Sequence, residues 1–184
     1  MTKDFDADRL MMKVEPAAVA TALIRAGAFL TGYELVKTAI VDEVKAFFIV
    51  GFDESGVTYS PAYEREVLGR DRNRFRASAA WLVSMDALTS AQVAELDEIY
   101  AHRNEVAHEL AKFLVDPDVE ISVRNLQALR GIMRSLDRFW GSINADTNPE
   151  FDDVEVDYDN IQSGGGILID YLLQLSGIGE GDQD

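Results

Sequence analysis

The stretch PAAVATALIRAGAFLTGYELVKTAIVDEVKAFFIV, residues 16 to 50, decides the fold. Pro16 suits the first turn of a helix, because proline has no backbone N–H to leave unpaired there. Beyond it, apolar side chains recur at spacings of three and four, as on one face of an amphipathic helix. These positions are Ile24, Phe29, Leu35, Val36, Ala39, Ile40 and Phe47. The pattern predicts one long helix with a face that other helices must cover.

Further helical patterns follow along the chain. They lie at residues 62–69, 73–88, 89–117, 121–143 and 164–177, and the Gly- and Ser-containing residues 51–61 are predicted to form a loop. Thr89, with Gln92 three residues later, has the pattern of a capping box, and Pro117 follows the expected end of that helix. Long helices joined by short turns predict an all-α antiparallel helical bundle of four to five helices with a short C-terminal helix.

Length and composition fit one globular domain. The chain has 184 residues, of which 47% are hydrophobic and 27% charged. We expect a flexible N-terminus over residues 1–15, the bundle over 16–145, and an acidic C-terminal segment over 146–184 that carries the short helix. The absence of cysteine excludes disulfides, a thiolate nucleophile and a cysteine-based zinc site.

The N-terminal sequence MTKDFDADRL lacks the apolar region of a signal peptide. No uninterrupted apolar run comes near the roughly 20 residues that span a bilayer. We therefore expect a cytoplasmic protein that does not enter a membrane.

Charge is distributed unevenly. The formal net charge is −16, and the residues after Arg138 contain 11 acidic side chains and no Lys or Arg. This balance argues against strong non-specific binding to nucleic acid. One basic cluster stands out nevertheless, formed by Arg65, Arg70, Arg72, Arg74 and Arg76. It is either a solvated loop and helix start or a phosphate-binding surface, and the acidic C-terminal segment is either a solvated tail or a competitor for that surface.

The helix predicted over residues 89–117 carries an unusual arginine. At about 100° per residue, Leu96, Leu110 and Leu114 fall within about 20° of Arg103. The arginine therefore sits at the centre of the apolar stripe, where an unpaired guanidinium would cost several kcal/mol. Such a residue needs an ion-pair partner on another helix, or a cleft.

Asn104 and His108 flank this stripe on one side. Asn104 lies at about 100° and His108 at about 140° from Arg103, so one straight helix cannot point Arg103 and His108 the same way. A site shared by the two would need a groove beside the helix or a second subunit. Taken alone, Arg103 is equally explained by a structural ion pair, and His108 by a position on the helix flank.

The segment RNEVAH, residues 103 to 108, resembles the R-x(4–6)-H motif of HEPN domains, in the variant with a polar residue directly after the arginine. The resemblance covers residues 16–145 and rests on the late position in a long helix, on Asn104, and on Ala107 before His108. HEPN proteins are small helical bundles that commonly dimerise with their motifs facing each other across the dimer axis. Many are metal-independent endoribonucleases that act as toxins or in phage defence, and others are catalytically silent scaffolds or binding modules.

The resemblance implies that Arg103, Asn104 and His108 form the catalytic set. Histidine titrates near neutrality and can take the proton of an RNA 2′-hydroxyl, while arginine can stabilise the charge that builds on the phosphate. It also implies an RNA substrate, a composite site in a homodimer, a possible neutralising protein partner, and no cofactor. Arg70, Arg72, Arg74, Arg76 and Tyr100 are the expected RNA-binding residues.

Other site types fit less well. Glu105 and His108 form a Glu-x-x-His pair, as in di-iron bundles, but the second pair that such a site requires is missing. The face with Glu98, His102, Glu105 and Glu109 is expected to lie in water, opposite the apolar stripe. We therefore predict no metal site. The sequence also contains no P-loop and no nucleophile elbow.

Overall fold

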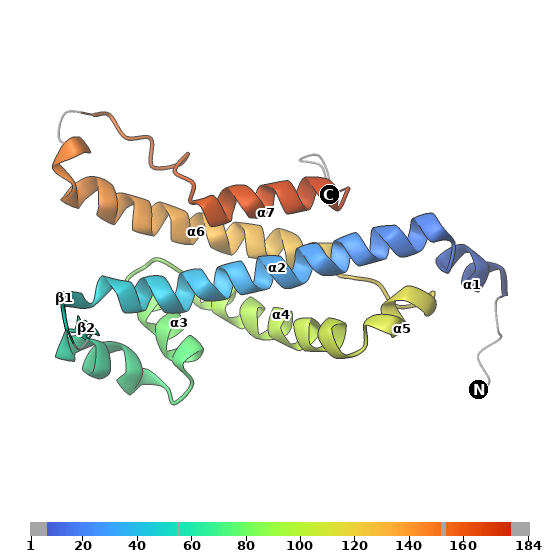
Figure 1. Ribbon diagram of the computed structural model, residues 1–184, viewed down its shortest axis with the longest axis horizontal. Coiled ribbons are helices and arrows are strands. Elements are labelled where there is room, and N and C mark those ends of the chain that lie inside the picture. The colour runs from blue at the N-terminus through green and yellow to red at the C-terminus, as the bar shows by residue number, and fades with distance from the viewer. Residues whose placement is uncertain (1–6, 55, 152–153, 178–184) are drawn as a thin grey trace.

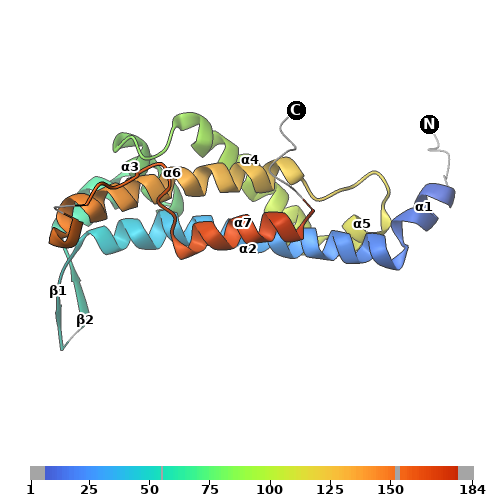
Figure 2. The same ribbon diagram turned by 90° about the horizontal axis from the view of Figure 1, so that it is seen from above.

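The computed structural model describes residues 7–54, 56–151 and 154–177 (Figure 1). Most of these residues are helical, which confirms the all-α class. The helices are long and lie roughly side by side, so the molecule is elongated along them (Figures 1 and 2).

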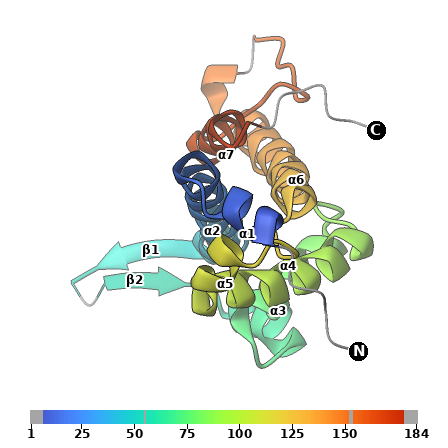
Figure 3. The same cartoon turned by 90° about the vertical axis from the view of Figure 1, so that its right-hand side faces the viewer.

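Helix α2, Pro16–Phe47, is the central element of the fold. Its fully buried side chains include Phe29, Val36, Ile40 and Val44, spaced by seven, four and four residues. Helices α3, α4, α6 and α7 all pack against it, and Figure 3 shows them gathered around one side of α2. Burying each such apolar side chain contributes about 1.5–3 kcal/mol to folding.

The surrounding helices begin at caps that the sequence supplies. Asn73, Thr89, Ser122 and Ser163 each accept a backbone N–H of the first turn, and Thr89 with Gln92 forms the predicted capping box. The helices that follow these caps are α3 Arg74–Ser84, α4 Ser90–His108, α6 Val123–Thr147 and α7 Gly164–Leu175. Within the N-terminal segment that we expected to be flexible, residues Ala7–Lys13 form helix α1.

The predicted loop at residues 51–61 is wrong. Residues Ile49–Asp53 form strand β1, and Gly56–Tyr59 form strand β2, which pairs with it antiparallel. Val, Phe, Thr and Tyr favour extended structure, and Gly56 adopts φ 118°, which glycine tolerates readily. Gly51 and Gly56, which suggested a loop, therefore belong to the strands of a hairpin that projects away from the helices (Figures 2 and 3).

The helix predicted over 89–117 is also interrupted. Helix α4 ends at His108, Glu109 leaves the helical conformation at ψ 29°, and a short helix α5 follows at Leu110–Val115. On an unbroken helix, His102 and Phe113 would lie about 16 Å apart along the axis. The break brings their ring centroids to 5.7 Å, with Phe113 fully buried.

The remaining short elements connect these helices. Residues Tyr63–Val67 form a π-helical turn, η1, and Leu68–Arg70 a 3-10 turn, η2, in place of the short helix predicted at 62–69. After α6, Pro149–Phe151 form a 3-10 turn, η3. The acidic C-terminal segment is tied to α6, because Asp159 pairs with Arg138 and Asp170 with Arg130.

One sequence inference about membranes needs correction. Helix α2 is long and apolar enough to cross a membrane by length and composition, with a mean hydropathy of 1.3 over its most apolar window. The helix has no uninterrupted apolar run of that length, because Arg25, Glu34 and Lys37 lie among its apolar residues. The helix that forms the core of a globular protein passes the same test, and one third of this window is buried here.

The first turn of α7 packs tightly on α6. A Cβ at Gly166 would collide with Oδ2 of the buried Asp137. We therefore expect Gly166→Ala to lower the free energy of unfolding by about 1–3 kcal/mol, as measured by urea denaturation. Gly164→Ala is the matched control, because Gly164 lies in the same turn and a Cβ there would meet open space. This variant should leave the free energy of unfolding unchanged or slightly raised. Equal stability of the two variants would contradict this packing.

Candidate functional site

A cleft of about 380 Å³ lies where α2, α4 and the start of α3 meet. Arg103 and Tyr100 line it from α4, Glu34 and Lys37 from α2, and Arg76 from α3. The structure thus gathers one predicted catalytic residue and two predicted RNA-binding residues around one opening.

Arg103 is held from two sides. Its Nη2 lies 3.0 Å from Oε1 of Glu34, and its Nη1 donates to Oδ1 of Asn104 at 3.3 Å. The guanidinium also lies over the Tyr33 ring, with Cζ 5.8 Å from the ring centroid. Its Nε is buried and meets no acceptor within the described part of the chain. The side chain is 30% exposed, so the arginine sits at the wall of a cleft and retains donors for a ligand.

Positive charge prevails in this cleft despite the acidity of the chain. Lys37, Arg76 and Arg103 line it together with two carboxylates, Glu34 and Asp97. Lys37 lies 2.9 Å from Glu34, and Arg76 lies 3.2 Å from Asp97. The hydrogen bond from Lys37, with a smaller contribution from Arg103, lowers the pKa of Glu34. The carboxylate is therefore ionised at neutral pH and compensates Arg103.

Aromatic side chains stand beside these charges. Tyr100 is 50% exposed, and its ring lies 6.2 Å from that of the buried Tyr33. Burial, and then the charge of Glu34, raises the pKa of Tyr33, so its hydroxyl stays protonated. The exposed Tyr100 offers a flat surface on which a nucleic-acid base can stack.

His108 does not line the cleft. It is exposed at the last residue of α4. Tyr100, Asn104 and His108 are spaced by four residues, so they follow one another along a single face of the helix. Asn104 links Arg103 to this row through its hydrogen bond. Within one chain the structure therefore places Arg103 and His108 on adjoining surfaces without bringing them together.

The basic cluster is dispersed. Arg76 reaches the cleft, whereas Arg70 donates to backbone carbonyls of Glu66 and Ala80. Arg72 and Arg74 are exposed and lie outside the cleft lining. Glu34 and Lys37 were not among the predicted site residues, although their spacing of three residues on a helix is a signal for an ion pair.

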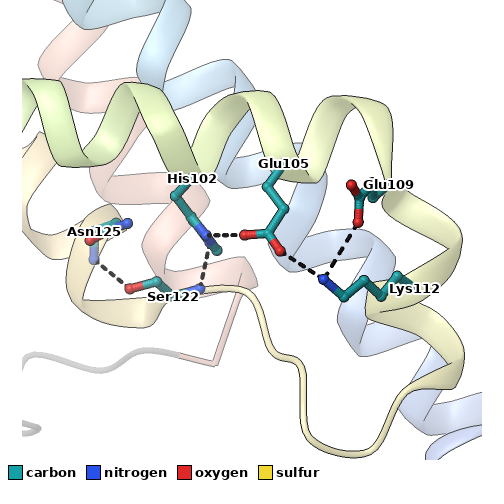
Figure 4. A network of polar contacts seen from close by, with 6 residues as sticks. All are labelled: His102, Glu105, Glu109, Lys112, Ser122 and Asn125. Carbon is teal, nitrogen blue, oxygen red and sulfur yellow. Dashed lines mark hydrogen bonds and ion pairs between the residues drawn. The ribbon is translucent and has the colours of Figure 1, made fainter.

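His102 does not lie in water as expected. Its ring packs between Phe29, at 5.0 Å, and Phe113, and its Nε2 accepts the backbone N–H of Ser122 at 3.1 Å. Figure 4 shows the hydrogen bond between His102 and Ser122, and beside it the ion pairs that Lys112 forms with Glu105 and Glu109. Burial lowers the pKa of His102 below its usual 6.5, and Glu105 opposes this only in part. His102 is therefore a structural, neutral histidine of α4 that contacts the N-cap residue of α6.

No group of three or more potential metal ligands lies together among the described residues. Comparison of the chain with protein-family models, with characterised proteins and with solved structures finds no match. The geometry of the cleft is thus the basis for any assignment.

The buried His102 should make stability depend on pH. The unfolded chain takes up a proton near pH 6.5 and the folded chain only at lower pH, so stability present above 6.5 is lost as pH falls through the folded pKa. His102→Phe fills the ring site but cannot titrate. His102→Phe should be less stable than wild type at about pH 7.5. The difference in unfolding free energy should become smaller as the pH is lowered to about 5.5, as measured by urea denaturation.

His102→Gln is the companion variant, because its side-chain oxygen can still accept the N–H of Ser122. It should be less destabilised than His102→Phe at neutral pH and show the same flattened pH dependence. Parallel pH curves for wild type and His102→Phe would refute the depressed pKa.

Proposed function

We propose that the protein is a metal-independent endoribonuclease of the HEPN type, acting in the cytoplasm, and that its cleft holds the RNA backbone. The observation that carries the proposal is the gathering of Arg103, Arg76 and Lys37 with the exposed ring of Tyr100, in a chain of net charge −16. Cationic donors match phosphate oxygens, and an aromatic ring accepts a stacked base.

In the proposed reaction the RNA strand follows α4 from Tyr100 towards His108. Arg103 exchanges Glu34 for a phosphate and stabilises the charge that builds on it. His108 takes the proton of the 2′-hydroxyl, whose oxygen attacks the phosphorus while the bond to the 5′-oxygen breaks. Asn104, already bonded to Arg103, positions the guanidinium. The products are a 2′,3′-cyclic phosphate and a 5′-hydroxyl.

We further propose that a second copy of the chain completes the site and that the partner's His108 returns a proton to the 5′-oxygen. Support comes from the outer face of α2, defined here as Ala20, Leu23, Ile24, Gly27 and Thr31. All five are exposed, Leu23 by 45% and Ile24 by 48%, and none is charged. A face without charge is typical of the core of a homodimer interface, and Gly27 leaves room for a close helix.

Catalysis is tested with a labelled single-stranded RNA in EDTA. Wild type should cut it and leave cyclic phosphate ends, and Arg103→Ala and His108→Ala should each cut at least about 100-fold more slowly. His102→Gln, at the other histidine of the helix, is the matched control and should keep most of the activity. Loss of wild-type cleavage in EDTA would contradict the mechanism.

A catalytically silent binding module is the second candidate, favoured by the Arg103–Glu34 ion pair that already occupies the guanidinium. It predicts RNA binding that Tyr100→Ala weakens by about 1–3 kcal/mol and no cleavage by any variant. Absence of both RNA binding and cleavage would exclude the ribonuclease and the RNA-binding module, and would leave a silent module that binds a partner protein.

The second copy is tested by light scattering after gel filtration. Ile24→Glu places a charge on the outer face of α2, and we expect the mass to fall from twice 20.4 kDa to 20.4 kDa with cleavage lost. Ala94→Glu, at an exposed position of α4, should leave the dimer intact. If the wild-type protein is a monomer, or stays in solution only with detergent, the outer face of α2 is not a homodimer interface.

A further inference from the structure

A second cavity, of about 410 Å³, lies at the end of the molecule where α1, α2 and α5 converge. Figure 3 looks onto this end and shows the three helices meeting there. The cavity shares no lining residue with the Arg103 cleft. The proposed function therefore leaves it unexplained.

Three cationic side chains line this cavity, Arg9 and Lys13 from α1 and Arg25 from α2. Glu120 is the one carboxylate on the described lining. Arg9 has a carboxylate partner, since its Nη1 lies 2.9 Å from Asp118. Such a concentration of positive charge is unusual in a chain with about twice as many acidic as basic residues.

Lys13 and Arg25 differ from Arg9 in their partners. Nζ of Lys13 donates to the carbonyl of Val119 at 2.8 Å, and Nε of Arg25 donates to the carbonyl of Ser176 at 3.2 Å. Within the described residues neither side chain forms an ion pair. A carbonyl orients a cation without neutralising it, and both side chains are half-buried. Their charge is therefore available to an anion in the cavity.

Apart from Thr21 and Pro117, the rest of the wall is apolar. It is formed by Met12, Ala18, Ala22, Phe113 and Ile121. Cavities of about 300–1,000 Å³ with an apolar wall and a few placed polar groups are typical of small-molecule sites. The wall and the cations together match a ligand with an apolar body and an anionic head.

We infer that this cavity binds a small organic anion in which a carboxylate or phosphate head is joined to an apolar body. The head meets Lys13 and Arg25, whose donors suit its oxygens. The body packs on Met12, Ala18 and Ala22, the apolar lining residues that are not buried. Helices α1, α2 and α5 and the residues after α5 each supply part of the wall. The bound anion therefore holds α1 against α2 and α5.

The inference is tested by calorimetric titration of the full chain with octanoate, phenyl phosphate, inorganic phosphate and octanol. We expect octanoate or phenyl phosphate to bind at least about tenfold more tightly than inorganic phosphate and octanol, because only these two probes combine a charged head with an apolar body. Failure of both to bind, or equal binding of octanol and octanoate, would overturn the inference.

Variants test the location. The double variant Lys13→Gln with Arg25→Gln should lose at least about tenfold in affinity, and Arg124→Gln, an exposed cation outside the cavity, should bind as wild type does. Thr21→Trp, at an exposed position of the lining, should block binding while keeping every charge. Arg103→Ala should leave binding unchanged, which separates this site from the ribonuclease proposal. Wild-type affinity in both the double variant and Thr21→Trp would place the anion elsewhere.

Discussion

The contact between Arg103 and Glu34 is the constraint on which the site depends. A guanidinium facing the core side of α4 is tolerated because a carboxylate on α2, an amide on α4 and the ring of Tyr33 surround it. The same contact links α4 to α2 at the wall of the cleft, where both charged side chains remain partly exposed to water. This partly exposed ion pair connects the two helices, and in the proposed reaction a phosphate takes the place of Glu34 beside the guanidinium.

The two histidines of α4 lie in opposite environments, one enclosed and one exposed. His102 is enclosed by Phe29 and Phe113 and accepts the N–H that begins α6, so burial keeps it neutral and fixed. His108 stands six residues later at the end of the helix, exposed to solvent. A proton carrier needs such access, whereas a capping acceptor needs enclosure. The break at Glu109 produces both conditions, because it ends α4 and turns Phe113 back onto His102.

Much of the fold could be predicted from the sequence, because its signals are local. The spacing of Phe29, Val36 and Ile40 predicts α2, and Thr89 with Gln92 predicts the start of α4. The errors arise where long-range contacts decide. Whether 49–59 forms a loop or a hairpin, and whether 89–117 bends at Glu109, depends on packing that periodicity does not record. The anomaly of Arg103 was visible, but its partner Glu34 lies 69 residues away in the chain, and no local pattern identifies such a pair.

The central place of α2 has a consequence for biosynthesis. Helix α2 is translated before α6 and α7, which cover much of it and end at residues 147 and 175. Until α6 and α7 have been translated, an apolar helix with a mean hydropathy of 1.3 over its most apolar window lacks two of the helices that pack against it. The nascent protein therefore passes through a period in which part of the apolar surface of α2 is accessible to chaperones and to other nascent chains. The folding yield will depend on how soon α6 and α7 are translated after α2.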